Sequence, residues 1–302
     1  MNINKNNKKI INILFAISIV SLLIISSGQS LVLLLSVPII LAALGLIGGY
    51  PEFLIGLLAS SLISYLFMDI HELFRTIIPL VFLSVILILL CKSKISDKYQ
   101  IAINFLLSSL VFIGIYKYEM ITRGVDITSM ARDLKEIMEA DSSYDISDTA
   151  YQLSVALYPS VLSTLSLFYS IVSLKLLRNY MAYKKRGTDM GSLRMIRITK
   201  KDFIFIIFLG LLSYIVIPGL LGVNSYFAGA NILWIIGAIL LLNGIFTYEY
   251  IMTNRQSNIT RGIRWFFVIV FFYFFSLFFI VLGIVDILVD FRNRPRRQIH
   301  VV

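Results

Sequence analysis

Nine long apolar segments follow one another along this chain, separated by short polar breaks. They cover residues 10–25, 31–48, 53–68, 74–91, 101–116, 153–177, 203–223, 228–248 and 265–285. A helix needs about 20 apolar residues to cross a hydrocarbon core of about 30 Å. Because lipid offers the backbone no hydrogen-bond partners, such segments are expected to be α-helices. The pattern therefore predicts an all-α fold, a polytopic transmembrane helix bundle of about nine spans.

Composition agrees with this pattern and narrows the function. The chain is 58% hydrophobic and 15% charged, whereas globular domains contain about 25% charged residues. Its single cysteine, Cys91, excludes an intramolecular disulfide framework. The sequence contains no zinc-protease motif, no nucleophile elbow and no phosphate-cradling glycine loop with lysine. We therefore expect no enzymatic activity, no cofactor and no metal site.

The distribution of lysine and arginine predicts how the chain is threaded. With the N-terminus in the cytoplasm, 18 basic residues fall on inner segments and five on the outer loops before the last helix. Residues 117–150 then form the largest extracytoplasmic loop. With nine crossings, however, the basic tail 292–297 lies outside, against the same rule. Eight membrane crossings therefore remain an alternative to nine, in which segment 203–223 crosses the membrane only in part.

A long basic loop, 178–201, divides the chain. It separates a six-helix part, residues 1–177, from a three-helix part with a basic tail, residues 202–302. Each basic residue near an anionic leaflet is worth about 1 kcal/mol, so membrane lipid is the expected partner of this loop. The simpler alternative is that these are ordinary charges that stop translocation. Either reading accounts for the net charge of +10, so no nucleic-acid partner is expected.

The outer loop 117–150 is expected to contain an amphipathic helix. Its apolar residues recur at helical spacing: Ile127, Met130, Leu134, Ile137 and Met138. Either Asp126 or Thr128 is suited to cap its N-terminus. Such a helix would lie over the outer mouth of the bundle or on the membrane surface. It could act as a gate over a binding cavity, or simply pack there without moving.

Polar residues in or next to the apolar segments are the candidate functional residues, because they are costly in lipid and usually face the bundle interior. The set comprises Asn104, Asn231, Asn243, Asp286, Asp290 and Arg292. For each asparagine the alternative role is an interhelical hydrogen bond, worth about 0.6–2 kcal/mol.

Two prolines and a charge pattern add local expectations. Pro159 and Pro218 remove helical hydrogen bonds and are expected to bend their helices. Asp286, Asp290 and Arg294 stand four residues apart. On a helix this spacing predicts a ladder in which the arginine partly neutralises the two carboxylates.

Residues 283–292 read GIVDILVDFR. This run resembles the closing signature of the YybS-like family of bacterial multi-pass membrane proteins. That signature has a glycine, two aliphatic residues and an aspartate, followed by an acidic or amide residue, an aromatic residue and an arginine. Further matches are Tyr158-Pro159-Ser160, Asn231 and Asn243-Gly244. The chain differs where Leu288 replaces the usual tryptophan, and where Asn243 stands in place of a commoner glutamine.

The resemblance implies a layout in the bacterial cytoplasmic membrane rather than an activity, because that family has no established one. Its first six helices are similar in count and orientation to the substrate-binding S component of energy-coupling-factor vitamin transporters. In those modules, outer loops, including the one before the sixth helix, close over the substrate. Here that loop is 117–150. The Ala-x-x-x-Ala contact pattern of their first helix is not matched, since Ala16 is followed by Val20.

Two functional hypotheses follow. In the first, the protein binds or transports a small molecule in the bilayer, in a cavity among the first six helices. Transport would then need transporter partner subunits, because the chain has no nucleotide-binding motif of its own. In the alternative, it is a non-transporting membrane scaffold or regulatory protein whose basic segments recruit lipid or other membrane proteins.

Overall fold

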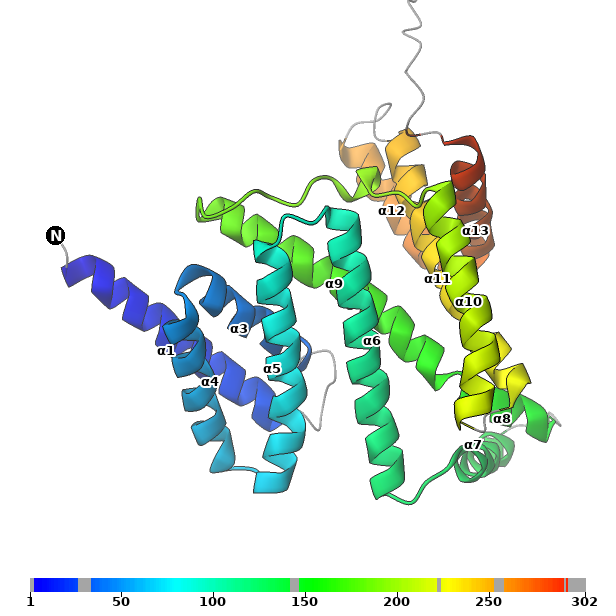
Figure 1. Cartoon of the computed structure of the whole chain (residues 1–302), viewed down its shortest axis with the longest axis horizontal. Coiled ribbons are helices and arrows are strands. Elements are labelled where there is room, and N and C mark those ends of the chain that lie inside the picture. Colours follow the sequence, from blue (N-terminus) through cyan, green and yellow to red (C-terminus); the bar gives the residue numbers. More distant parts are fainter. Residues whose placement is uncertain are drawn as a thin grey trace, which may run out of the picture. The chain divides into compact units, whose positions relative to one another are not determined.

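The computed structural model describes residues 3–26, 34–141, 147–221, 224–252, 258–290 and 292 of the chain (Figure 1). All regular elements within these residues are helices, as the apolar segments predict. The chain divides into two compact units. The first combines Met1–Gly114 with Leu165–Met190, and the second combines Ile115–Thr164 with Gly191–Val302. The helices α6 (Asp97–Thr122) and α9 (Tyr158–Tyr183) contribute residues to both units.

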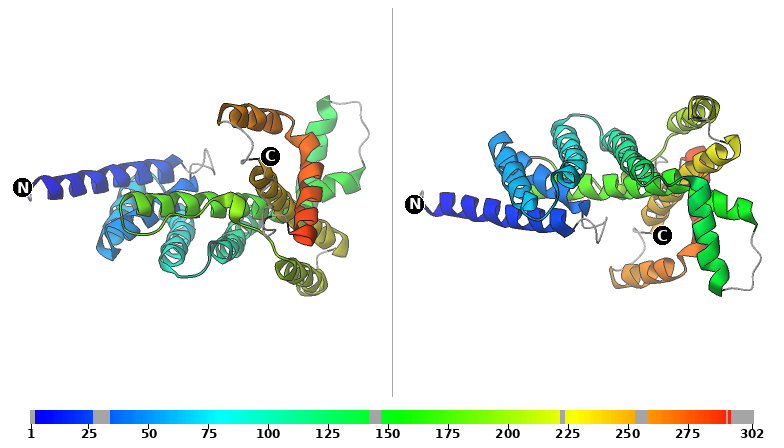
Figure 2. Two further views of the ribbon diagram at one scale, coloured as in Figure 1. Left: turned by 90° about the horizontal axis from the view of Figure 1, so that it is seen from above. Right: turned by 90° about the horizontal axis from the view of Figure 1, so that it is seen from below.

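The first unit is a bundle built on the N-terminal helices. It contains α1 (Ile3–Ile25), α3 (Ser36–Ile47), α4 (Tyr50–Tyr65) and α5 (Ile70–Lys92). Helices α1 and α3 pack on α4, and α3 also packs on α5. Both views of Figure 2 show α1, in dark blue, running beside its shorter neighbours. Gly49 allows the tight α3–α4 turn because its φ of 114° suits only glycine.

The second unit is organised around one helix pair. It contains α7 (Ile127–Asp141), α8 (Asp148–Ala156), the short 3₁₀ helix η2 (Leu193–Met195), α10 (Lys200–Leu221), α11 (Ser225–Met252), α12 (Asn258–Val270) and α13 (Phe272–Val289). Helix α11 packs along α13 and also contacts α10 and η2, while α7 packs on α8.

Five helical segments of the described residues are long and apolar enough to cross a membrane. They are Ile70–Lys92, Asp97–Thr122, Asp148–Tyr183, Ser225–Met252 and Phe272–Val289. Their outer surfaces support a lipid environment: Tyr273 and Phe274 of α13 are 86% and 77% exposed. Large apolar side chains that gather on an exposed face mark contact with something other than water. The structure thus supports a membrane-embedded helical bundle, while the count of nine spans stays a prediction.

The ninth predicted segment, 265–285, is not one helix. The structure ends α12 at Val270 and begins α13 at Phe272, with Phe271 between them outside the helical conformation. At the start of this segment, Arg264 and Trp265 both donate to Glu249 Oε2, each at 2.8 Å, which anchors α12 to the end of α11. Apolar sequence continues on both sides of the break, so hydropathy alone could not reveal it.

The helix expected in the loop 117–150 is confirmed as α7. Of the two expected caps, the structure assigns Asp126: its Oδ1 accepts from the Ser129 backbone N–H at 2.7 Å, and its own N–H donates to Ser129 Oγ at 3.0 Å. The backbone hydrogen bond from Ser129 holds the pKa of Asp126 below its ordinary value of 3.8. Lys135 of α7 reaches Asp148 of α8 at 2.7 Å.

Two glycines let α11 and α13 approach at backbone distance. A Cβ at Gly244 would lie well inside contact distance of the Phe279 carbonyl oxygen, and one at Gly283 would collide with the Leu240 carbonyl oxygen. Both obstacles are backbone atoms, which cannot rotate away. Small residues at helix crossings have this role in membrane bundles. The close approach brings the polar residues of the two helices within hydrogen-bond distance.

We predict that Gly244→Ala destabilises the protein by about 1–3 kcal/mol, because overpacking forces the two helices apart. The matched control is Gly237→Ala on the same helix, where nothing lies within 4 Å of the added Cβ. Denaturant titration in detergent micelles, followed by tryptophan fluorescence, measures both. Equal stability of the two variants would contradict the proposed crossing.

Candidate functional site

A buried arginine forms the centre of the second unit. The Arg292 side chain is 1% exposed and its partner Asp286 is 2% exposed. Arg292 donates to Asp286 Oδ2 from Nη2 at 2.6 Å and from Nε at 3.2 Å. Its Nη1 donates to the carbonyl oxygens of Arg194 and Ile196. Through these hydrogen bonds, the guanidinium of Arg292 joins the end of α13 to the segment that precedes α10.

Asn243 of α11 completes this centre. Its Oδ1 accepts from Arg292 Nη2 at 2.6 Å and from the Ile198 backbone N–H at 3.3 Å. Its Nδ2 donates to the Gly283 carbonyl at 3.0 Å. We call Asn243, Asp286 and Arg292 the polar centre. Three of the six candidate residues from the sequence therefore lie together, and Asn243 is 49 positions away from Arg292 in the chain.

A turn at Asp290 explains how Arg292 reaches back to Asp286. Helix α13 ends at Val289, and Asp290 adopts the left-handed conformation with φ 55°. This conformation is uncommon for residues other than glycine, and aspartate is among those that tolerate it. The turn replaces the continued helix on which the predicted charge ladder depended, and Arg294 of that ladder lies outside the described residues. Asp290 itself forms an ion pair with Arg197.

A pocket of about 530 Å³ lies beside the polar centre. Residues 197–201 line one side and residues 286–290 line the other. Asp286 is part of this lining, and its Oδ1 is buried without a hydrogen-bond partner in the described structure. That oxygen is closed to solvent, so it lies behind the surface of the pocket rather than on it. The pocket volume falls in the usual range for small-molecule sites, about 300–1,000 Å³.

Asn231 lies apart from the polar centre and bridges the break between α8 and α9. Its Nδ2 donates to the Ala156 carbonyl at 2.8 Å, and its Oδ1 accepts from the Ser160 N–H at 2.9 Å. In a continuous helix those two backbone groups would bond to each other. The asparagine amide is inserted into this gap. Pro159 is the second residue of α9, a position where its missing N–H breaks no helical bond.

Asn104 lies in a seam of buried polar residues between α6 and α9 in the first unit. Its Nδ2 donates to Ser173 Oγ at 3.4 Å, while its Oδ1 is buried without a partner in the described structure. Ser108 and Ser170 lie 3.4 Å apart in the same seam. The sequence carried a signal for this seam in the serines that recur on one face of α9, which are Ser160, Ser163, Ser166, Ser170 and Ser173.

Pro218, the second proline that is expected to bend its helix, lies within α10.

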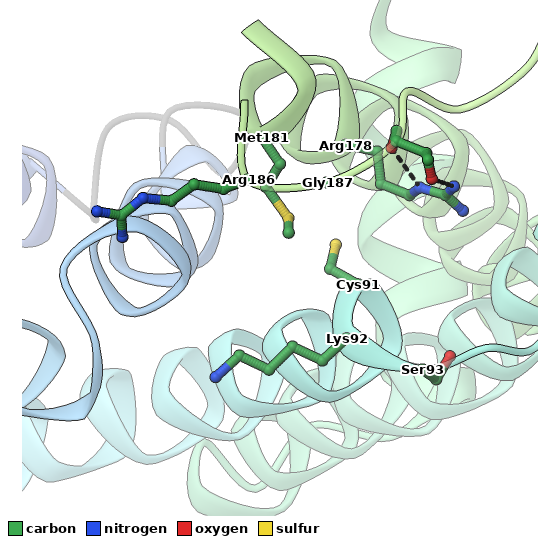
Figure 3. A pocket seen from close by; sticks show the side chains of 8 residues that line it. Cys91, Lys92, Ser93, Arg178, Met181, Arg186 and Gly187 are labelled. Atoms are coloured by element: carbon green, nitrogen blue, oxygen red, sulfur yellow. Dashed lines mark hydrogen bonds between the residues drawn. The ribbon is translucent and has the colours of Figure 1, made fainter. Parts of the chain in front are cut away.

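A second pocket, of about 300 Å³, lies in the first unit (Figure 3). The Cys91 and Met181 sulfur atoms point toward each other, and Lys92 and Arg186 also line it. Arg178 forms an ion pair with Asp97 and donates a hydrogen bond to Thr188 Oγ1 at 3.1 Å. Both α5 and α9 end near this pocket, and the carbonyl ends of helices favour basic residues. The charges here therefore have a structural explanation.

Comparison of the chain with protein families, with curated proteins and with solved structures finds no match. The resemblance to the YybS-like family therefore stays a prediction that rests on the residues quoted above. Of the residues quoted for it, Arg292 and Gly283 form hydrogen bonds with Asn243, and Arg292 also bonds to Asp286.

We predict that Arg292→Leu destabilises the protein by about 3–5 kcal/mol, because it leaves the Asp286 carboxylate buried without its charge partner. Replacing both residues by leucine should cost less than the single change, since no lone charge then remains. Arg123→Leu is the control, because its ion pair with Glu119 is exposed and should contribute about 0–1 kcal/mol. Denaturant titration in micelles compares the variants. If Arg292→Leu loses no more stability than the control Arg123→Leu, the Arg292–Asp286 pair has no stabilising role.

We predict opposite outcomes for the same substitution at two asparagines. Asn231→Leu strands the Ala156 carbonyl, while the Ser160 N–H keeps its bond to the Leu157 carbonyl at 3.1 Å, and it should destabilise by about 1–3 kcal/mol. Asn104→Leu removes a buried acceptor that has no partner and should be nearly neutral or stabilising. Thermal unfolding in detergent distinguishes the two. A loss for Asn104→Leu as large as that for Asn231→Leu would contradict this prediction and show that Asn104 stabilises the contact with Ser173.

Proposed function

We propose that this is a membrane-embedded protein that binds a small molecule in the pocket beside the polar centre. The observation that carries the proposal is the pocket of about 530 Å³ between residues 197–201 and residues 286–290, which lies beside the buried polar centre. Its volume is within the range of small-molecule sites.

The surroundings of the pocket support a preformed site. Helix α13 contributes one wall and the first turn of α10 with its preceding segment contributes the other. Arg292, Asn243 and the Arg197–Asp290 ion pair tie these two walls together. A site whose supporting side chains are already fixed loses little conformational entropy when the ligand binds.

The proposed site differs in place from the cavity suggested by the S-component resemblance. That resemblance points to a cavity under the loop 117–150, yet neither of the two pockets described above is lined by residues of that loop. With the N-terminus in the cytoplasm, the count of basic residues places 197–201 on the inner side. We therefore propose a binding site that opens toward the cytoplasmic surface, in a protein of the bacterial cytoplasmic membrane. Transport across the membrane would still require partner subunits.

We predict that a broad thermal-shift screen of purified full-length protein finds a stabilising metabolite, and that Val289→Trp abolishes its effect by filling the pocket. Ligand at about 100 times its dissociation constant stabilises by about 2.7 kcal/mol. Val281→Trp is the matched control, because Val281 lies on the same helix, is 50% exposed and is not part of the pocket lining.

Loss of the shift in Val289→Trp with retention in Val281→Trp would support binding at this pocket. A screen with no stabilising compound would count against the proposal and favour the scaffold alternative. The exposed basic residues Lys184, Lys185 and Arg186 are the observation that fits that alternative.

A further inference from the structure

The ninth apolar segment, 265–285, keeps to one end of helix α11. Among the described residues, the hydrogen bonds, ring contacts and backbone approaches that 264–292 make with α11 fall between Leu240 and Glu249. That stretch of helix is about 14 Å long, at about 1.5 Å per residue. A segment that crossed the membrane beside α11 would follow it for about 30 Å. These contacts are therefore too confined for a segment that crosses.

Both ends of the segment contact α11 at nearly the same level. Before the segment, Arg264 and Trp265 donate to Glu249 Oε2. After it, Arg292 donates to Asn243 Oδ1 at 2.6 Å and to two backbone carbonyls of the segment before α10. Asn243 and Glu249 are six positions apart in α11, which is about 9 Å along the helix axis. The chain therefore returns close to the level from which it left.

The chain turns at Phe271, where α12 ends and α13 begins, and Figure 2 shows the two helices turned away from a common axis. Trp265 of α12 and Phe278 of α13 both contact the Tyr248 ring, with ring centroids 6.1 and 6.3 Å from it. Trp265 stands six positions before Phe271, and Phe278 stands seven positions after it. Two arms that meet one residue at equal distances from a turn form a hairpin.

The backbone at this turn keeps hydrogen-bond partners, which a position in hydrocarbon requires. The Phe271 N–H donates to the Phe267 carbonyl at 3.0 Å. The Phe271 carbonyl accepts from the Phe274 and Phe275 N–H groups, at 3.0 and 3.2 Å. The break between the two helices is therefore compatible with a lipid environment.

Polar residues mark the start and the end of the hairpin, and its middle is apolar. Arg261 and Arg264 lie in the first half of α12, whereas residues 265–285 contain no charged residue. Trp265, at the junction of the two regions, is a residue type enriched at the membrane–water interface. Helix α12 has 13 residues and is about 20 Å long, too short to cross by itself. The large apolar side chains exposed around the turn are Phe266, Phe267, Ile269, Val270, Tyr273 and Phe274.

We propose that α12 and α13 form a hairpin that inserts into one leaflet of the membrane and returns to the side from which it entered. The exposed aromatic side chains around Phe271 then contact lipid acyl chains, and the charged residues at both ends lie at the headgroups. The chain beyond Arg292 lies on the same side as 194–201. This arrangement has eight crossings, with 203–223 as a full one, and it removes the conflict between the basic tail 292–297 and the charge rule.

The first test maps single cysteines in full-length protein in native membranes, with Cys91→Ala as background and a membrane-impermeant maleimide as the probe. We expect Gln298→Cys and Ser257→Cys to react from the same side as Lys201→Cys. Ser225→Cys, between α10 and α11, should react from the opposite side. Reaction of Gln298→Cys from the side of Ser225→Cys would show that 265–285 crosses and would overturn the inference. Reaction of all four from one side would overturn it as well, since α10 and α11 would then not cross.

The second test asks whether both arms lie in one leaflet, and it changes only exposed side chains. A nitrobenzoxadiazole label is attached at Phe266→Cys or Leu288→Cys, which are 63% and 62% exposed in the native protein. Dithionite is then added to one side of the membrane. We expect both labels to be reduced at least about tenfold faster from the side of Lys201→Cys, because the dithionite anion does not enter hydrocarbon.

The matched control is a pair on the crossing helix α10, Phe205→Cys and Ile215→Cys, which are 59% and 72% exposed. These two labels should be reduced from opposite sides. If the labels at 266 and 288 behave like this control pair, the segment crosses and the inference is wrong. Protection of both labels from both sides would also overturn it, because the ends of the hairpin would then lie at the middle of the bilayer.

Discussion

A charged side chain in a low-dielectric interior must find its partners inside the protein, and this constraint organises the second unit. Arg292 is buried to the level of a core residue, yet it carries a full charge. It is stabilised because it meets one carboxylate, one amide oxygen and two backbone carbonyls. Removing any one partner would leave a polar group unsatisfied. The segment before α10, the end of α13 and the middle of α11 are therefore fixed relative to one another.

That arrangement depends in turn on two residues without side chains. Gly244 and Gly283 let the backbones of α11 and α13 approach until Asn243 can donate to a carbonyl of the facing helix. The same close contact brings Asp286 to the depth at which Arg292 can reach it from beyond the turn at Asp290. The two kinds of residue thus depend on each other here. The small residues allow the helices to approach closely, and the buried polar residues then form hydrogen bonds that need this short distance.

The polar residues of the bundle fall into two classes. Asn231 is fully used by the structure, since it replaces a missing helical hydrogen bond at the junction of α8 and α9. The Asp286 carboxylate is only half used, because one of its oxygens is saturated by Arg292 and the other is orphaned. Both side chains are buried and serve the fold, so the proposed binding site at the end of α13 rests on the pocket between residues 197–201 and residues 286–290.

The sequence by itself determined the all-α class, most of the helix positions, the amphipathic α7 and the identity of the polar candidates. These follow from local properties, namely hydropathy, periodicity and the cost of polar groups in lipid. It could not show that α12 and α13 are separate helices, because apolar residues continue through Phe271. Nor could it show that Asn243, Asp286 and Arg292 meet while Asn104 and Asn231 lie elsewhere. Those facts depend on a backbone turn at Asp290 and on the glycine crossing, and contacts between residues 49 positions apart are decided only when the chain folds.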